Sequence, residues 1–431
     1  MSFVKAGVGR ADITPLLGTL LAGYPRERPA KYVLDPLTVT ALALEAGETR
    51  SLILSICGIV ATDELTEQIR ASVNKVTGWD KLQINVCMWH THTAPHTFWS
   101  WGWGDVDHPY CDNILVPGCV EAAKLAVADI GEVTVGIGTT SCAAGVNRRQ
   151  VLEDGSIDFG QNPWGPYDPT MTAIRFLRDG KPYANIIHYG THATAIGSSF
   201  RISRDWPGIM VDRVEELIGG MTLFLNGAIG DVGPRPSDGT TGATEENLRE
   251  VGHCAAQAAV RACKDIKHFA PMELEVLVDD ITFTYRPLPD KATAEKKFVL
   301  ARENRGDGWG MQEAEYKYWE AVLGEITCGN SKSSDMFTQT ITRIGPVAIV
   351  PFPGEPFSEI SLRLRQYSPI QHTLAVSCSN GNFGYITTRD ALHRGGYEAE
   401  SRKMNSPYFL AENIDDVLIQ ENLRLLRKMK V

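Results

Sequence analysis

Short apolar runs alternate with amphipathic segments along most of the 431-residue chain. Apolar runs bounded by turn residues are typical of buried strands, whereas apolar residues spaced by three or four are typical of one helical face. The segment 62–76 shows the helical pattern, because Leu65, Ile69 and Val73 fall on one face. Thr62 stands before this segment as a candidate N-cap.

The same patterns recur along the whole chain. Helices are predicted at 62–76, 113–129, 205–219, 245–266, 291–304, 311–324, 356–366 and 411–428. Strands are predicted at 36–46, 50–57, 81–88, 132–142, 172–178, 183–188, 221–226, 272–286, 335–351 and 372–379, the first two as a pair. Since the two kinds of element do not alternate regularly, we predict an α/β fold: a layered αβ sandwich with mixed β-sheets.

No repeat and no low-complexity linker divides the chain. A weak boundary lies near 268–272, where a helical pattern gives way to a β-rich stretch. We therefore expect residues 1–431 to form a single large catalytic domain. The P-loop and Rossmann fingerprints are both missing from the sequence.

Composition narrows the classes of partner. The formal net charge of -10 argues against a protein that binds nucleic acid or an anionic membrane surface. The first residues lack a secretory signal pattern, and no apolar stretch reaches the ~20 residues of a membrane span. The nine cysteines are scattered without a CxxC pair, which indicates reduced thiols and no cysteine zinc site. We expect a cytoplasmic protein with a small-molecule substrate and no stable membrane association; whether it forms a homo-oligomer stays open.

Three of the ten histidines fall within seven residues, as His90, His92 and His96, directly after the predicted strand 81–88. In an extended chain, His90 and His92 point to the same side. Imidazole is the commonest metal-binding side chain, so the pair is a candidate metal site. Two hydrogen-bonded loop histidines would produce the same pattern.

Two further strand ends carry candidate ligands. His192 follows the strand 183–188, whose own His188 fits a core position better. Glu355 follows an apolar strand and a Pro-Phe-Pro-Gly turn. A metal must be fixed from more than one direction, so histidines at two strand ends suit a split zinc site. For Glu355 alone, a favourable place at a helix N-terminus is the simpler explanation.

Six short motifs in one order link these residues. They are Gly-Val-Gly-Arg-Ala-Asp-Ile-Thr-Pro at 7–15, His-Thr-His-Thr-Ala-Pro at 90–95, Thr191-His192, Gly-Asp-Val at 230–232, Pro-Gly-Glu at 353–355, and Tyr-Ile-Thr-Thr at 385–388 with Tyr397-Glu398. In this order the chain resembles the neutral/alkaline ceramidase family.

The resemblance implies a zinc ion bound by four side chains, with three more near the polar head of the substrate. The implied zinc ligands are His90, His192, Glu355 and Tyr385; the implied catalytic residues are His92, Arg148 and Tyr397. Arg148 is matched only through the pair Asn147-Arg148, and Arg149 is adjacent. In the family, water activated by the metal attacks the amide carbonyl of an N-acylsphingosine, which is consistent with the effect of zinc on water and carbonyl groups.

The chain also departs from the family. Where the family has an active-site serine in Gly-Asp-x-Ser-Pro, this chain has Gly233, and Ser237 is the nearest alternative hydroxyl. Direct attack by activated water survives that change, whereas a covalent serine mechanism does not. We also expect the C-terminal immunoglobulin-like domain and the secretion signal of ceramidases to be missing.

A tryptophan-rich loop follows the histidines. Its aromatic residues are Trp99, Trp101 and Trp103, followed by Asp105 and Asp107. Such a loop can fold onto its own aromatic core. It can also form an aromatic wall that suits a sugar-like or ring-shaped polar substrate. Trp164 and Trp309, in other Gly-rich or Pro-rich loops, are candidates for the same wall.

From the sequence we expect a zinc-dependent hydrolase that cleaves an amide (N-acyl) bond, with a small polar or sugar-like substrate. Three alternatives stay open. They are a zinc esterase or lactonase on the same scaffold, a non-catalytic ceramidase-like binding protein, and a true ceramidase working in the cytosol.

Overall fold

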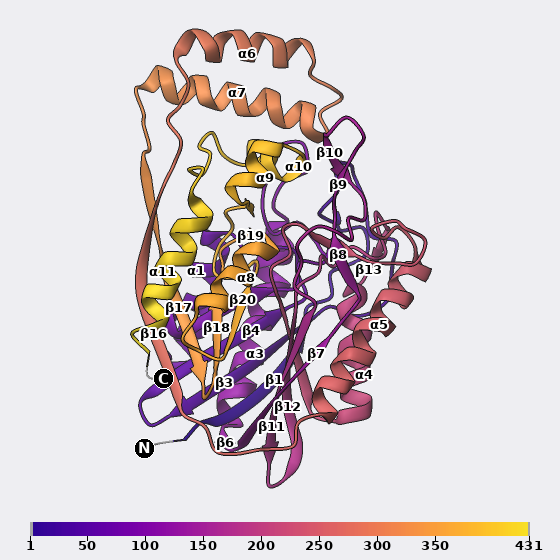
Figure 1. Cartoon of the computed structure of the whole chain (residues 1–431), viewed down its shortest axis with the longest axis vertical. Coiled ribbons are helices and arrows are strands. Elements are labelled where there is room, and N and C mark those ends of the chain that lie inside the picture. The colour runs from indigo at the N-terminus through magenta and orange to yellow at the C-terminus, as the bar shows by residue number, and fades with distance from the viewer. Residues whose placement is uncertain (1–2, 430–431) are drawn as a thin grey trace.

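The computed structural model describes residues 3–429, which form three large β-sheets and four two-stranded ribbons, with helices packed outside the large sheets (Figure 1). Each large sheet combines antiparallel pairs with one parallel pair, β4–β5, β12–β14 or β18–β20. The predicted α/β fold with mixed β-sheets is confirmed.

The first sheet has the strand order β5-β4-β3-β1-β6. Its strands are β1 (Lys5–Asp12), β3 (Thr38–Ala46), β4 (Thr49–Ile56), β5 (Ile84–Met88) and β6 (Gly131–Glu132). The helices α1 (Asp63–Thr77) and α3 (Val116–Ala128) share a hydrophobic core with one face of this sheet. Thr62 caps α1 through its side chain, as predicted.

The second sheet has the order β14-β12-β11-β7. Its strands are β7 (Thr134–Ser141), β11 (Thr170–Arg178), β12 (Lys181–Tyr189) and β14 (Met221–Asn226). The helices α4 (Asp205–Ile218) and α5 (Glu245–Lys264) lie side by side along it (Figure 1).

The third sheet has the order β16-β17-β18-β20. Its strands are β16 (Leu274–Thr284), β17 (Ser334–Ile344), β18 (Val347–Pro351) and β20 (His372–Val376). The helices α8 (Ser358–Tyr367) and α11 (Ile414–Leu426) pack on it. Between β16 and β17, the helices α6 (Lys291–Glu303) and α7 (Gly310–Cys328) form a hairpin at one end of the molecule (Figure 1).

Short elements complete the chain. They are β2 (Tyr32–Val33), η1 (Lys81–Gln83), α2 (His108–Tyr110), η2 (Cys111–Leu115), β8 (Gly145–Asn147), β9 (Arg149–Val151), β10 (Ile157–Phe159), β13 (Arg201–Ile202), β15 (Val232–Pro234), β19 (Glu355–Pro356), β21 (Tyr385–Ile386), α9 (Arg389–Arg394), α10 (Tyr397–Glu400) and η3 (Ser401–Met404).

One hydrophobic core joins all three sheets. Leu42 of the first, Ile186 of the second and Ile349 of the third belong to the same buried cluster.

On the opposite face of the first sheet, α3 packs closely against β1, which explains the glycines of the motif at 7–15. A Cβ on Gly7 or Gly9 would come within 2.0 Å or 2.5 Å of carbonyl oxygens of α3, so these glycines permit the helix to approach.

The strand predicted at 335–351 is wrong as a single element. It is a hairpin of β17 and β18 that turns at Gly345, whose φ of 52° places it in the left-handed region. The Gly345-Pro346 pair within this range is a turn signal, and it separates the alternating pattern of β17 from the apolar run of β18. None of the helices among residues 3–429 is long and apolar enough to cross a membrane.

Candidate metal centre and substrate pocket

Two strand ends bring the first candidate ligands together. His90 lies two residues after β5, and His192 lies three residues after β12. A parallel bridge between Thr91 and Ala193 joins the two loops directly after these strands. Consequently the two histidines face each other, with ring centroids 4.9 Å apart.

A second pairing brings in the other two candidate ligands. The chain turns after β18, and Glu355 pairs in parallel with Tyr385 in the small ribbon β19–β21. The Tyr385 hydroxyl lies 3.5 Å from His192 Nε2, and Glu355 Oε2 lies 3.0 Å from the same nitrogen. The four residues implied as zinc ligands therefore meet in one place.

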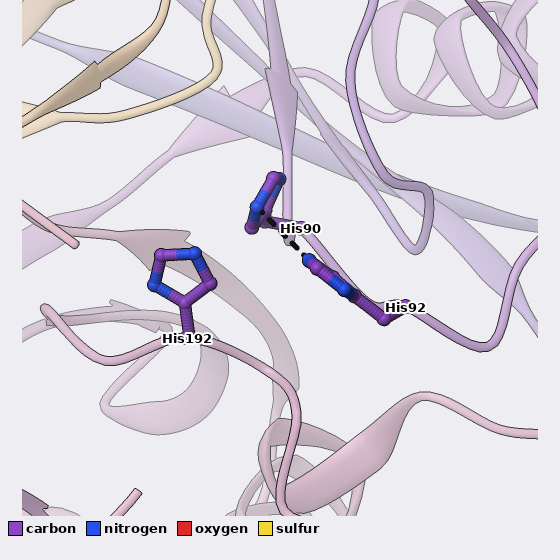
Figure 2. A group of neighbouring side chains, drawn as sticks. All are labelled: His90, His92 and His192. Carbon is purple, nitrogen blue, oxygen red and sulfur yellow. Dashed lines mark hydrogen bonds between the residues drawn. The ribbon is translucent and has the colours of Figure 1, made fainter. Parts of the chain in front are cut away.

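Three histidine side chains point into one space (Figure 2). One nitrogen from each of His90, His92 and His192 lies within 4.8 Å of the others. His90 Nε2 and His92 Nε2 are 3.2 Å apart. His90 and His192 are buried, so bulk water reaches little of this space.

Backbone carbonyls determine which nitrogen each ring presents. The Nδ1 atoms lie 2.9 Å from Ile59 O for His90, 3.2 Å from Gly23 O for His92 and 2.8 Å from Ile229 O for His192. A carbonyl only accepts, so each Nδ1 donates, and a ring in its neutral form then keeps a lone pair on Nε2. Lone pairs that face each other at 3.2 Å repel unless a cation lies between them.

Glu355 adds a buried anion to this space. Its Oε2 accepts no hydrogen bond from any described residue, although His192 Nε2 and His90 Nε2 lie 3.0 Å and 3.4 Å away. Burial would raise the pKa of this carboxyl, but His90, His192 and Arg148 outweigh it and lower the pKa to about 2. Burial lowers the pKa of His192 to about 4. The carboxylate is therefore an anion beside the Nε2 atoms of His90 and His192, and such a group binds a divalent cation.

The donor set fits zinc. Ligand atoms at bond lengths of about 2.0–2.1 Å around a tetrahedral zinc ion lie roughly 3.3 Å from one another. The separations from His192 Nε2 to Glu355 Oε2 and to the Tyr385 hydroxyl, 3.0 Å and 3.5 Å, bracket this value. Nitrogen and oxygen donors together suit zinc and other borderline divalent metals. The backbone of His90 is held at φ 66°, a strained conformation that is concentrated at functional sites.

A pocket of about 350 Å³ opens beside the histidines. Its aromatic walls include Tyr24, Trp103, Phe159 and Tyr397, and its polar surface includes His92 and Arg148. The remaining lining residues are Gly23, Pro25, Thr194, Gly233, Thr241, Gly242 and Tyr385. The pocket therefore combines apolar rings with a few polar groups, which is typical of a small-molecule site.

The three residues implied as catalytic all line this pocket. Arg148 donates from Nη2 to the Tyr385 hydroxyl at 2.9 Å. Burial works against its charge, but Tyr385, Glu398 and Glu355 raise the pKa of Arg148 above its usual value. Burial, and then the neighbouring His90, hold the pKa of His92 well below its usual value. At neutral pH the pocket has a permanent cation beside an uncharged imidazole.

The same arrangement of elements is found in solved structures. A neutral ceramidase from Pseudomonas aeruginosa matches with a TM-score of 0.73 and 17% identity, over 100% of this chain and 76% of that chain. A ceramidase complexed with C2 matches with a TM-score of 0.75 and 17% identity, over 99% of this chain and 75% of that chain. The chain has the neutral ceramidase fold. No protein-family model matches it, and no curated protein matches it in sequence.

The ceramidase fold gives structural reasons for several of the shared motifs. A Cβ on Gly230 would come within 2.5 Å of the Glu355 carbonyl oxygen, so this glycine lets the two loops touch. Asp231 accepts from Ser358 N at 2.7 Å and from Asn147 Nδ2 at 3.0 Å, which ties α8 to β8. These residues support the ligands without facing the pocket.

One of the tryptophans lines the pocket, and the others lie elsewhere. Trp103 is buried and lines the pocket, as the aromatic-wall interpretation predicts. Trp101 instead packs in a cluster with Tyr318 and Val322 of α7. Trp99 is partly exposed, and Trp164 is 95% exposed. Among the described residues, Trp103 is the one tryptophan that contributes to this pocket.

Other expected residues lie outside the pocket. Asp107 accepts a hydrogen bond from Tyr110 N and caps α2. Trp309 precedes α7 as its N-cap residue. His188 is buried and bonds to the carbonyl oxygen of Ala375 at 2.8 Å, in agreement with its predicted core position. Ser237 is exposed and does not line the pocket, so it does not replace a hydroxyl at Gly233.

Sequence reasoning missed the loop that closes the site behind His92. A Cβ on Gly23 would come within 2.4 Å of the His92 ring. The fully buried Arg28 donates to the carbonyl oxygen of His92 at 2.8 Å. The Gly-Tyr-Pro run at 23–25 signals a turn, but nothing in the sequence indicates that this turn contacts the histidine loop.

Proposed function

We propose that the chain is a zinc-dependent hydrolase that cleaves an amide (N-acyl) bond in a small polar or sugar-like substrate. The observation that carries the proposal is the convergence of the Nε2 atoms of His90 and His192 on Glu355 Oε2, beside His92, which lines a 350 Å³ pocket. The shared ceramidase fold supports the reaction class.

In this proposal His90, His192, Glu355 and Tyr385 hold the zinc ion. His92 also contributes a nitrogen to the cluster; we assign it to the substrate because it lines the pocket. A bound zinc ion supplies Lewis-acid chemistry, because it polarises a carbonyl and makes water more acidic.

The remaining residues act on the substrate. Arg148 Nη1 makes no hydrogen bond to any described residue, so it is available to donate to the acyl oxygen as negative charge develops there. The Tyr397 hydroxyl, whose one neighbouring acceptor among residues 3–429 is Met404 Sδ at 3.8 Å, is a second donor. His92 Nε2 offers a lone pair that can orient attacking water.

The pocket supports a compact substrate. At about 350 Å³ it is at the small end of the range for ligand sites, and aromatic rings face its polar groups. Rings of this kind suit the apolar faces of a cyclic substrate, while Thr194 and Thr241 offer hydroxyls to its polar edge.

Substrate profiling tests the proposal. Zinc-loaded protein is assayed on N-acetylated amino sugars, short-chain ceramide, and matched esters and lactones. We expect the highest kcat/KM on a compact N-acyl substrate. Preferential cleavage of esters or lactones would change the assigned bond, and release of sphingosine as the fastest reaction would overturn the small polar substrate. No hydrolysis of any of these compounds by zinc-loaded protein would overturn the enzyme assignment.

A further inference from the structure

Three charged side chains lie buried behind the pocket: Arg148, Arg149 and Glu398. Arg148 Nε donates to Glu398 Oε1 at 3.0 Å, and Arg149 Nη1 donates to Glu398 Oε2 at 2.6 Å. Both carboxylate oxygens are thus occupied by different guanidinium groups. Two cations and one anion leave this cluster with a net positive charge, and Arg148 is the member that reaches the pocket.

Glu398 determines the orientation of the Arg148 guanidinium. This group is planar, so fixing two of its nitrogens also fixes the third. Glu398 holds Nε, while the Tyr385 hydroxyl and the carbonyl oxygen of Gly230 accept from Nη2 at 2.9 Å and 3.0 Å. The unbonded Nη1 is thereby held in one direction beside the pocket.

Arg149 fixes Glu398 and the chain around it. Its Nη2 donates to the carbonyl oxygens of Gly395 at 2.6 Å and Ala391 at 3.2 Å. Gly395 stands two residues before Tyr397, which lines the pocket. Without Arg149, one oxygen of Glu398 would lose its partner, and the segment that carries Tyr397 would lose its attachment to β9.

We infer that Glu398 and Arg149 are positioning residues for the proposed hydrolysis, and that Glu398 acts through Arg148. The inference rests on the proposed function, because it concerns how the acyl oxygen is bound. Neither residue touches the pocket's histidines in the hydrogen bonds and ion pairs of residues 3–429, so their effect on the reaction has to pass through Arg148, Tyr385 or Tyr397.

A double-mutant cycle tests the inference. Glu398→Gln is expected to lower kcat at least 10-fold while KM changes less than about 3-fold, since donors to the acyl oxygen act mainly in the transition state. Arg148→Gln is expected to lower kcat at least as much. If Glu398 acts through Arg148, the double variant is no slower than Arg148→Gln alone. Independent, multiplying losses in the double variant would overturn the inference.

Controls separate positioning from folding and metal loss. Glu412→Gln changes a carboxylate that is exposed and pairs with His393, and it is expected to leave kcat unchanged. Zinc content is expected to stay at about one ion per chain in Glu398→Gln. If that variant does not fold, Glu398→Asp takes its place in the cycle, because it retains the charge and moves it by one methylene. A loss of activity that follows zinc loss would overturn the inference.

A binding measurement keeps the inference independent of turnover. Acetate stands for the carboxylate product, and its Kd for zinc-loaded protein is measured by calorimetry. Glu398→Gln is expected to weaken acetate binding about 10-fold, and Glu412→Gln is expected to leave it unchanged. If wild-type protein hydrolyses nothing but the acetate difference holds, the proposed function fails while the positioning of Arg148 stands. Equal acetate affinity in both variants would overturn the inference.

Discussion

Backbone carbonyls prepare each histidine of the candidate metal centre. The carbonyl oxygens of Ile59, Gly23 and Ile229 accept hydrogen bonds from the three Nδ1 atoms, so each Nε2 is the nitrogen available to bind a metal. The i, i+2 spacing predicts that His90 and His92 share a side. Their carbonyl partners lie on distant loops, and no local pattern identifies them. The sequence therefore predicts the ligand types, but not the arrangement that fixes their tautomers.

Trp103→Ala tests the aromatic wall at the scale of one residue. Trp103 is buried against the pocket, so its removal is expected to raise KM about 10-fold, which corresponds to about 1.4 kcal/mol of binding free energy. Zinc content is expected to stay unchanged, because the ring holds none of the candidate ligands. Steady-state kinetics on a compact N-acyl substrate measure the effect.

Two other tryptophans serve as controls for that substitution. Trp164 is 95% exposed, so Trp164→Ala is expected to change neither KM nor the melting temperature. Trp101 packs against α7, so Trp101→Ala is expected to lower the melting temperature. An unchanged KM in Trp103→Ala would refute its place in the substrate site.

At the scale of elements, local sequence signals predict a capped amphipathic helix better than they predict a turn between two strands. The cap at Thr62 and the apolar stripe behind it correctly predict α1. The single strand predicted at 335–351 overlooks the turn signal Gly345-Pro346, at which the hairpin of β17 and β18 turns. Strand β1 was not predicted as an element at all. Its glycines weaken any strand pattern, and their role depends on the approach of α3, which only the folded chain reveals.

Gly9→Ala tests that packing. The added Cβ would come within 2.5 Å of the Ala122 carbonyl oxygen and of Leu125 Cβ. Overpacking of this kind is expected to lower the free energy of unfolding by about 1–3 kcal/mol. Gly324→Ala in α7 is the matched control: no atom lies within 4 Å of its added Cβ, and alanine is expected to stabilise that helix by about 0.5–1 kcal/mol. Chemical denaturation measures both, and equal effects would contradict the packing argument.

Asp205 at the start of α4 gives a pH-dependent prediction. It accepts from the backbone N–H groups of Ala195, Ile196 and Trp206, yet burial raises its pKa to about 6. Between pH ~4 and 6, the folded protein holds a proton that the unfolded chain has released. The contribution of Asp205 to stability is therefore expected to fall as the pH rises through this window.

Comparison with Asp205→Asn isolates this contribution, because asparagine does not titrate. Urea unfolding of metal-free protein is measured at pH 4.5 and pH 7. The stability of the wild type relative to the variant is expected to be lower at pH 7. A relative stability that is constant or rises with pH would show that the carboxyl is not protonated in the folded state.

At the scale of the whole molecule, each sheet sends one loop to the metal centre. His90 follows β5 of the first sheet, His192 follows β12 of the second, and Glu355 follows β18 of the third. Periodicity predicts the strands, but sheet order and the bridge between Thr91 and Ala193 depend on contacts between distant segments. Periodicity therefore does not show which strand ends meet. The six ordered motifs do, because the resemblance that they carry groups His90, His192 and Glu355 in one site.

Metal binding is expected to stabilise the entire fold, since its ligands come from all three sheets. Zinc present at 100 times its Kd contributes about 2.7 kcal/mol to stability if it binds the folded state alone. The melting temperature of metal-free protein is therefore expected to rise by several degrees on addition of zinc. His192→Ala is expected to show no such rise. An equal rise in both proteins would indicate zinc binding elsewhere.

The most direct test of the account is the zinc content of the purified protein, measured by elemental analysis together with hydrolysis of an N-acyl substrate. We predict about one zinc ion per wild-type chain, and a joint loss of zinc and turnover in His192→Ala and in Glu355→Gln. A wild-type protein that hydrolyses the substrate without metal, or variants that retain both zinc and full turnover, would contradict it.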